Sequence, residues 1–213
     1  MKVELENVLP REIEARSFEI ITQELGDTPL IPGTELIVKR CIHTSADFDY
    51  AKNLRFSEGV VEKALKAIQN GASIVTDTQM DRAGINKKAL ARYGGEVYCF
   101  MSDEDVARKA KENGTTRATA SMDKAASLGI PLIFAIGNAP TALVRLYELI
   151  AEKKLSPELI IGVPVGFVNV VASKELIMET ETPYIVAAGR KGGSNIAACI
   201  CNALLYMLNN SRE

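Results

Sequence analysis

Short runs of apolar and β-branched residues alternate with helical segments from residue 54 onward. This alternation is typical of a mostly parallel sheet whose two faces are both covered by helices. It excludes an all-α bundle and an all-β sandwich, and it favours an α/β fold. We predict strands at residues 54–56, 73–76, 97–100, 132–136, 159–163 and 184–188.

Helical periodicity and helix-end signals fill the chain between and before these strands. Pro10 and Gly26 mark the two ends of the first helix, and Thr34 is a candidate N-cap of the second. No repeat of fixed period and no linker composition interrupts the pattern, so we predict one domain over residues 1–213. Helices are predicted at residues 10–25, 35–44, 58–69, 87–93, 103–112, 116–128, 141–153, 168–178 and 195–208.

Composition narrows the class of protein. A net charge of −2 lacks the basic excess of a general nucleic-acid binder. No apolar stretch is long enough for a membrane helix, and the first residues do not resemble a signal peptide. The four cysteines have no C-x-x-C spacing and the chain has one histidine, so we expect no zinc site and reduced thiols in a cytoplasmic protein.

The unusual residues gather where the predicted strands end. Ligands of such sheets bind beyond the carboxyl ends of the strands. The segments that follow the strands there are 77–80 (DTQM), 137–141 (GNAPT), 164–167 (PVGF) and 189–194 (GRKGGS). The helix that begins near Arg117 leads into a strand, so its first turn lies at the same edge. We expect Thr78, Asn138 and Arg117 to face a shared site.

The turn at residues 189–194 is a candidate anion site. It is rich in glycine, carries Arg190 and Lys191, and opens a helix whose first N–H groups attract anions. Its spacing matches neither the Walker A nor the G-x-G-x-x-G pattern, so phosphate and carboxylate fit equally well. A solvated loop is the competing interpretation. For Arg117 the competing interpretation is a surface ion pair, and for Asn138 it is a helix cap before Pro140.

His43 is the candidate acid or base, because histidine is the side chain that ordinarily titrates near neutrality. On the predicted helix Arg40, His43 and Thr44 are neighbours at i, i+3 and i+4. A packed or surface histidine is the competing interpretation, and Cys41 is either a nucleophile or a small core residue. The residues alone therefore indicate an α/β enzyme with an anionic ligand and a candidate histidine acid/base.

Seven segments, in order, resemble the precorrin-8X methylmutase family, including its cobalt-precorrin-8 form. Together they extend over almost the whole chain. The sequence departs from the family pattern at Ala46, where glycine is common, and at Ala172, where an acidic residue is common. The segments are 13–21 (IEARSFEII), 39–48 (KRCIHTSADF), 77–85 (DTQMDRAGI), 117–122 (RATASM), 137–143 (GNAPTAL), 162–168 (GVPVGFV) and 189–194 (GRKGGS).

The resemblance implies a flavodoxin-like three-layer α/β/α fold, a homodimer, and a small corrinoid substrate with no cofactor or protein-bound metal. Any cobalt belongs to the substrate. It also implies migration of a methyl group from C11 to C12 of the macrocycle in cobalamin biosynthesis, giving hydrogenobyrinic or cobyrinic acid. His43 matches the family's proton donor/acceptor. The predicted substrate-binding set is Ser17, Arg40, Thr44, Thr78, Arg117, Asn138, Arg190, Lys191, Gly192 and Ser194.

A methyl shift on a conjugated ring needs one placed proton and no nucleophile, metal or hydride donor. Our hypothesis is that His43 hydrogen-bonds or protonates the ring C nitrogen and so localises the double bonds for the shift. Two alternatives stay open. One is a flavodoxin-like nucleotide or phosphosugar enzyme that uses the turn at 189–194, and the other is a non-catalytic tetrapyrrole carrier in which His43 is dispensable.

Overall fold

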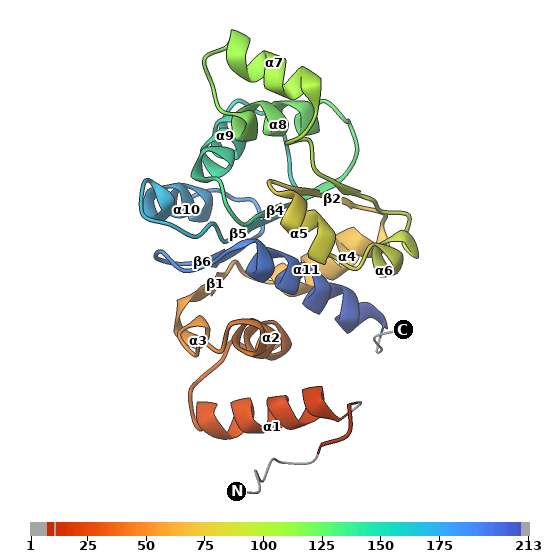
Figure 1. Cartoon of the computed structure of the whole chain (residues 1–213), viewed down its shortest axis with the longest axis vertical. Coiled ribbons are helices and arrows are strands. Elements are labelled where there is room, and N and C mark those ends of the chain that lie inside the picture. Colours follow the sequence, from red (N-terminus) through yellow and green to blue (C-terminus); the bar gives the residue numbers. More distant parts are fainter. Residues whose placement is uncertain (1–7, 11, 210–213) are drawn as a thin grey trace, which may run out of the picture.

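A computed structural model describes residues 8–10 and 12–209. Six strands form one sheet in the order β1-β6-β5-β4-β2-β3 (Figure 1). β2 to β6 are parallel, and β1 is antiparallel to β6. The parallel strands, renumbered from the first, have the order 2-1-3-4-5 of flavodoxin-like sheets. The strands are β1 (Leu54–Phe56), β2 (Ser73–Thr76), β3 (Val97–Tyr98), β4 (Leu132–Ile136), β5 (Leu159–Gly162) and β6 (Tyr184–Ala187).

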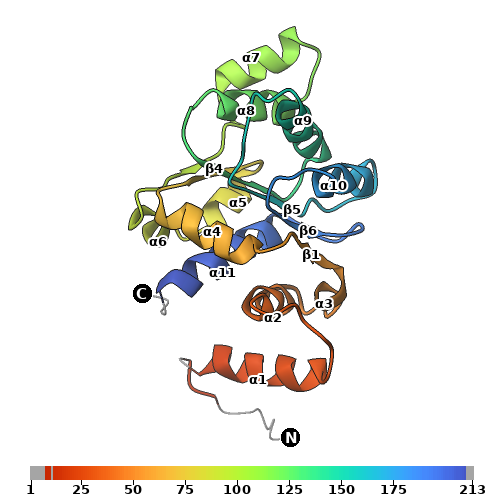
Figure 2. The same ribbon diagram turned by 180° about the vertical axis from the view of Figure 1, so that it is seen from behind.

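Helices cover both faces of the sheet, which confirms the expected α/β fold class (Figures 1 and 2). On one face lie α2, α4 and α11, with α1 outside α2. On the other lie α8, α9 and α10, with α7 outermost. The helices are α1 (Ile13–Leu25), α2 (Glu35–Ser45), α3 (Tyr50–Asn53), α4 (Val60–Gln69), α5 (Gln79–Gly84), α6 (Lys87–Ala91), α7 (Glu104–Glu112), α8 (Arg117–Ala126), α9 (Pro140–Ala151), α10 (Val170–Met178) and α11 (Ser194–Asn209).

The central strand β4 divides the core into two clusters. Ile133 and Ala135 pack in the cluster of α2, α4 and α11, whereas Phe134 and Ile136 pack in the cluster of α8, α9 and α10. All four side chains are at most 1% exposed. A strand that is buried on both faces has no need of polar residues, which explains its continuous apolar run.

Several predicted boundaries are confirmed and a few are wrong. The strands at 54–56, 73–76 and 132–136 have the predicted limits, whereas β3 ends at Tyr98, two residues early. The short helices α3 and α5 were not predicted, because a helix of one turn has no apolar period to detect. Residues 1–7, 11 and 210–213 are outside the described part of the chain, so the single domain over 1–213 stays a prediction. The expectation that the first residues are not a signal peptide also concerns residues outside the described part.

The predicted start of the second helix is confirmed at Glu35, and that of the first helix is wrong. Thr34 occupies the N-cap position of α2, but its hydroxyl donates to the Ile31 carbonyl at 2.8 Å and caps no N–H group. The first helix begins at Ile13, three residues after Pro10. Its predicted end is confirmed, since Gly26 follows Leu25 with a φ of 50°. None of the helices in the described part of the chain is long and apolar enough to cross a membrane.

The C-cap of α2 is Ala46, three residues after His43. Ala46 has a φ of 55°, and its N–H donates to the Ile42 carbonyl at 2.7 Å. This left-handed conformation favours glycine, because a Cβ atom there is crowded by the following carbonyl. The structure therefore accounts for a glycine preference at this position.

Replacing Ala46 by glycine should stabilise the fold. Removing the Cβ relieves about 1–2 kcal/mol of backbone strain and loses about 0.5–1 kcal/mol of chain entropy. We expect the free energy of unfolding in urea to rise by about 0.5–1 kcal/mol. The matched control is Ala15→Gly in the regular part of α1, which should lower it by about 1 kcal/mol. Equal losses in both variants would contradict the strain.

Candidate active site

A cavity of about 370 Å³ lies between α2, α5 and α11, on the carboxyl side of the sheet. Its size suits part of a small-molecule ligand. A second cavity of about 490 Å³ at the opposite edge is lined by residues such as Lys153, Pro157 and Pro183 and by none of the predicted site residues. The first cavity is lined by Arg40, His43, Thr44, Met80, Gly84, Ser194, Asn195, Ala198, Cys199, Asn202 and Tyr206.

His43 stands in the last turn of α2 with its imidazole exposed at this cavity. The ring meets the edge of Phe18 from α1 at a centroid distance of 5.7 Å and an interplanar angle of 82°. This contact restricts the orientation of the imidazole without covering it. His43 is therefore placed to meet a ligand in the cavity.

Arg40, one turn earlier, forms a nearly buried wall of the cavity. Its side chain is 12% exposed and pairs with Glu14 at 2.8 Å. The guanidinium also lies 4.5 Å from the ring centroid of Tyr206 and 5.6 Å from that of Phe18. Such cation–π contacts and the ion pair hold the group in one place. Arg40 thus joins α1, α2 and α11 around the cavity.

Cys199 is a cavity residue that the sequence reasoning missed. The Thr44 hydroxyl donates to its sulfur at 3.2 Å. Its interaction with Cys41 is the main cause that lowers the pKa of Cys199 to about 7, and the Thr44 hydrogen bond and the Arg40 charge add to it. Cys41 itself is fully buried, and the same interaction together with burial raises its pKa. Cys41 is therefore a core residue, and Cys199 is the cysteine that lines the cavity.

Two close backbone approaches fix the glycine-rich turn before α11. A Cβ on Gly192, whose φ is 156°, would lie 2.0 Å from the Val163 carbonyl oxygen. A Cβ on Gly137 would lie 2.6 Å from the Cα of Ser194. The hydroxyls of Ser194 and Thr78 are 2.8 Å apart. These contacts bring three strand ends together at the start of α11, as the sequence predicted.

The two cations of the turn have different surroundings. Arg190 is exposed, lies 5.3 Å from the Phe167 ring centroid, and pairs with no carboxylate among the described residues. Lys191 instead lies 2.6 Å from Asp47 and 2.6 Å from Asp49, and hydrogen bonds to both raise its pKa. The structure therefore leaves Arg190 available to an anion and uses Lys191 to join the turn to the loop after α2.

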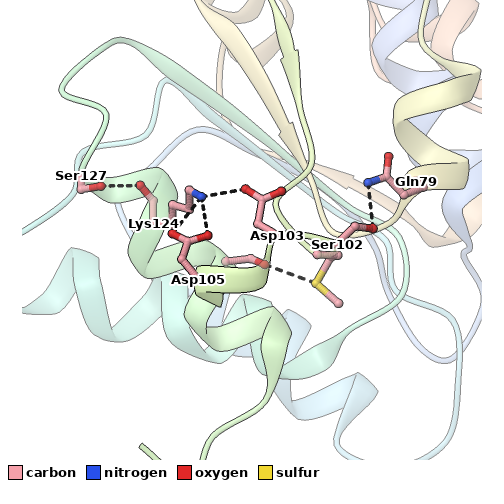
Figure 3. Close-up of polar contacts among 8 residues, drawn as sticks. Gln79, Ser102, Asp103, Asp105, Lys124 and Ser127 are labelled. Carbon is pink, nitrogen blue, oxygen red and sulfur yellow. Dashed lines mark hydrogen bonds and ion pairs between the residues drawn. The ribbon is translucent and has the colours of Figure 1, made fainter. Parts of the chain in front are cut away.

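Arg117 is the first residue of α8. It lies at the same edge of the sheet as the turn at residues 189–194. The side-chain oxygens of Thr116 and Thr141 are 3.0 Å apart, which places the starts of α8 and α9 together. In Figure 3 Lys124 of α8 reaches Asp103 at 2.7 Å and Asp105 at 2.8 Å. These ion pairs hold α8 against α7. Arg117, at the other end of α8, is exposed.

Asp77 holds the turn that carries Asn138. Its buried carboxylate accepts hydrogen bonds from the N–H groups of Gly137, Asn138 and Ala139 at 2.5–2.9 Å. Burial raises the pKa of Asp77, and these three bonds oppose the shift. The competing interpretation of Asn138 as the cap of this helix is wrong, since Ala139 is the N-cap and Asp77 accepts from the N–H groups. The Asn138 side chain stays exposed at the rim.

Ser17 does not line the cavity, and the same holds for Thr78, Arg117, Asn138, Arg190, Lys191 and Gly192 of the predicted set. The Ser17 hydroxyl donates to the Ile13 carbonyl of its own helix at 2.9 Å. Its neighbour Phe18 contacts His43, so Ser17 lies on the helix beside the site. Among the described residues, no group of three histidine, cysteine or acidic side chains could hold a metal ion.

Asp81 of α5 is a buried carboxyl behind the cavity. The side chain is 0% exposed, and neither oxygen has a hydrogen-bond partner among the described residues. Burial, with a smaller contribution from the Asp77 charge, raises its pKa from 3.8 to about 9. The folded protein thus binds a proton that the unfolded chain releases above pH 4, so this group lowers stability as pH rises from about 4 to 9.

Asp81→Asn should therefore stabilise the protein in a pH-dependent way. We expect the free energy of unfolding at pH 7 to rise by at most about 4 kcal/mol, because pH 7 lies about three units above the ordinary pKa. At pH 4 both side chains are neutral, and the difference should vanish. Urea unfolding at the two pH values measures this, and an equal gain at both would show that the charge plays no part.

Comparisons with known proteins agree with this arrangement. The family model described as precorrin-8X methylmutase matches residues 12–207. The cobalt-precorrin-8 methylmutase of Priestia megaterium is 45% identical over 95% of this chain and 90% of its own length. That of Salmonella typhimurium is 44% identical over 95% and 97%. The crystal structure of precorrin-8X methylmutase from Thermus thermophilus superposes with a TM-score of 0.86 at 40% identity, over 94% of this chain and 98% of that one.

These matches extend over nearly the whole described chain and include every segment that forms the cavity and its rim. The chain is 40–45% identical to these three relatives, and it has the same fold as the Thermus thermophilus protein. The chain therefore belongs to the precorrin-8X methylmutase family and is an isomerase.

Proposed function

We propose that this isomerase moves a methyl group from C11 to C12 of precorrin-8X or cobalt-precorrin-8 in cobalamin biosynthesis, and so forms hydrogenobyrinic or cobyrinic acid. The observation that carries the proposal is the exposed imidazole of His43 at a cavity beside a cationic rim. A polycarboxylate ring needs such a combination of a slot and separate anion sites. Family membership supports the same activity.

His43 acts as the proton donor and acceptor of the reaction. The shift moves a methyl group within one molecule, so no atom is gained or lost and the catalyst must only redistribute the double bonds. A proton delivered to the ring C nitrogen localises those bonds and makes the migrated isomer accessible, after which the proton returns to the imidazole. Placed acid/base groups contribute about 10²–10⁴ in rate.

The rim binds the periphery of the macrocycle. The cavity of about 370 Å³ accommodates one edge of the ring, which leaves the remainder over the rim. There the side chains of Met80, Phe167 and Val168 are 71–80% exposed and offer an apolar surface to the flat ring. Arg190 and Arg117 bind carboxylates at two separate places, while Thr44, Thr78, Asn138, Gly192 and Ser194 contribute polar contacts.

The form of the substrate follows from the relatives. The Priestia megaterium and Salmonella typhimurium proteins, at 45% and 44% identity, are both named for the cobalt-containing substrate. We therefore infer that the ring carries cobalt, as part of the substrate. The reaction itself uses no cofactor and no protein-bound metal. Comparing turnover of the cobalt-containing and metal-free rings tests this inference directly.

The assembly is proposed to be a cytoplasmic homodimer. Apolar side chains that are exposed on this chain include Ile13 at 52% and Ile20 at 37%, both on α1. On the same helix, Ile21 and Leu25 are buried. A second subunit would cover such apolar residues, and it would lie close to Phe18 and the cavity.

Replacing His43 by alanine should lower turnover by about 10²–10⁴ while product still binds, because the ring keeps its other contacts. The change in visible absorption during turnover measures the rate. Lys63→Ala on α4, away from the cavity, is the control and should match the wild type. Wild-type turnover by the His43 variant would eliminate the proposed role, and binding without turnover by the wild type would favour a tetrapyrrole carrier.

Replacing Arg190 and Lys191 of the turn by neutral residues should change KM and its salt dependence to different extents. Arg190→Gln should raise KM about tenfold and reduce its dependence on salt, because an exposed charge-assisted bond to a carboxylate is lost. Lys191→Gln should have a smaller effect on the salt dependence, since that lysine already pairs with Asp47 and Asp49. A KM series from low to high salt measures both. Identical slopes for the wild type and Arg190→Gln would contradict the anion site.

A further inference from the structure

Lys174 is a buried lysine directly behind the turn at residues 189–193. Its side chain is on α10 and is 1% exposed. The ammonium donates hydrogen bonds to the Gly189 carbonyl at 2.8 Å and to the Lys191 carbonyl at 2.9 Å. These two carbonyls flank Arg190, so one buried cation fixes the backbone on both sides of the exposed arginine.

The charge of Lys174 has no counter-charge in the described part of the chain. No carboxylate pairs with it, in contrast to Lys124 and Lys191, which each contact two aspartates. A buried ammonium without an anion is costly, because carbonyl dipoles replace only part of its hydration. Burial accordingly lowers the pKa of Lys174 from 10.5 to about 8.

Neighbouring ionisable groups do not explain this shift. The elements packed against α10 are α9, β5 and β6, and the turn lies beyond them. Burial alone lowers the pKa of Lys174, and no neighbouring charge contributes. Arg145 forms ion pairs with Asp123 and Glu148. The ionisable side chains on these elements, on α10 itself and on the turn are Arg145, Tyr147, Glu148, Glu175, Tyr184, Arg190 and Lys191.

We propose that Lys174 is the positioning residue of the anion site, and that a substrate carboxylate at Arg190 supplies its missing counter-charge. The proposal rests on the function inferred above. With both carbonyls held from behind, the Arg190 side chain and the first N–H groups of α11 are directed to the ligand side of the turn. The buried ammonium adds a positive potential there that water screens weakly.

This arrangement makes affinity depend on pH. A carboxylate bound at the turn favours the charged form of Lys174, so its pKa rises on binding and the complex takes up a proton above about pH 8. Affinity must therefore fall as pH rises from about 8 to 10. If the ligand raises the pKa by about one unit, the dissociation constant grows by about tenfold over this range.

The test is absorbance titration of the wild type and two variants with the corrinoid product between pH 7 and 9.5. Lys174→Met removes the charge, so it should weaken binding about tenfold at pH 7 and give a flatter pH profile. Lys174→Arg keeps its charge throughout, so it should bind well at pH 9.5. Cys199 also titrates at the cavity, but it is common to all three proteins and leaves their difference unaffected. Parallel profiles in wild type and variants would overturn the proposal.

A readout without ligand separates this proposal from the proposed function. Amide hydrogen exchange at residues 189–193 should be faster in Lys174→Met than in the wild type, because the turn loses its support. Unchanged exchange would overturn the positioning role. Faster exchange in a protein that binds no corrinoid would leave that role intact and would instead contradict the substrate. Should Lys174→Met fail to fold, the Lys174→Arg and wild-type profiles still decide the outcome.

Discussion

The close backbone approach at Gly192 is the constraint on which the site depends. Because no side chain intervenes, the turn before α11 contacts the end of β5 directly, and Gly193 donates to the Val163 carbonyl at 2.8 Å. α11 consequently begins at the rim of the sheet, where Ser194 meets the loop after β2. The same helix supports α2, which carries His43. The position of the imidazole thus depends on a contact between the segments that follow β5 and β6, far later in the chain.

Most cationic side chains around the cavity form ion pairs within the protein, so few of them remain to bind an anionic ligand. Arg40 is held by Glu14 and two aromatic rings, and Lys191 is held by two aspartates. Arg190 remains exposed, and buried Lys174 lies behind it. In the proposed function, His43 is the acid/base group at the cavity and the exposed Arg190 of the turn is a separate anion site. This separation suits a flat ring that carries carboxylates at its periphery and reacts near one edge.

Much of the fold could be predicted from the sequence, because a parallel strand that is buried on both faces has a continuous apolar run. β2 and β4 are examples. The gathering of loops at the carboxyl edge followed from topology alone. Contacts between distant residues could not be predicted: Lys191 pairs with Asp47 and Asp49, which lie more than 140 positions away. For similar reasons the capping role of Asp77 and the isolation of Lys174 became visible only in three dimensions.

His43 is the only histidine in the chain, so it can be observed selectively. Protein labelled with ¹⁵N-histidine should give the imidazole signals of one residue, and titration with the corrinoid product tests whether this ring meets the ligand. We expect both nitrogen shifts to change as the site fills, and the protonation of the imidazole to change with them. Imidazole signals that stay the same at saturating ligand would contradict a proton exchanged between His43 and the macrocycle.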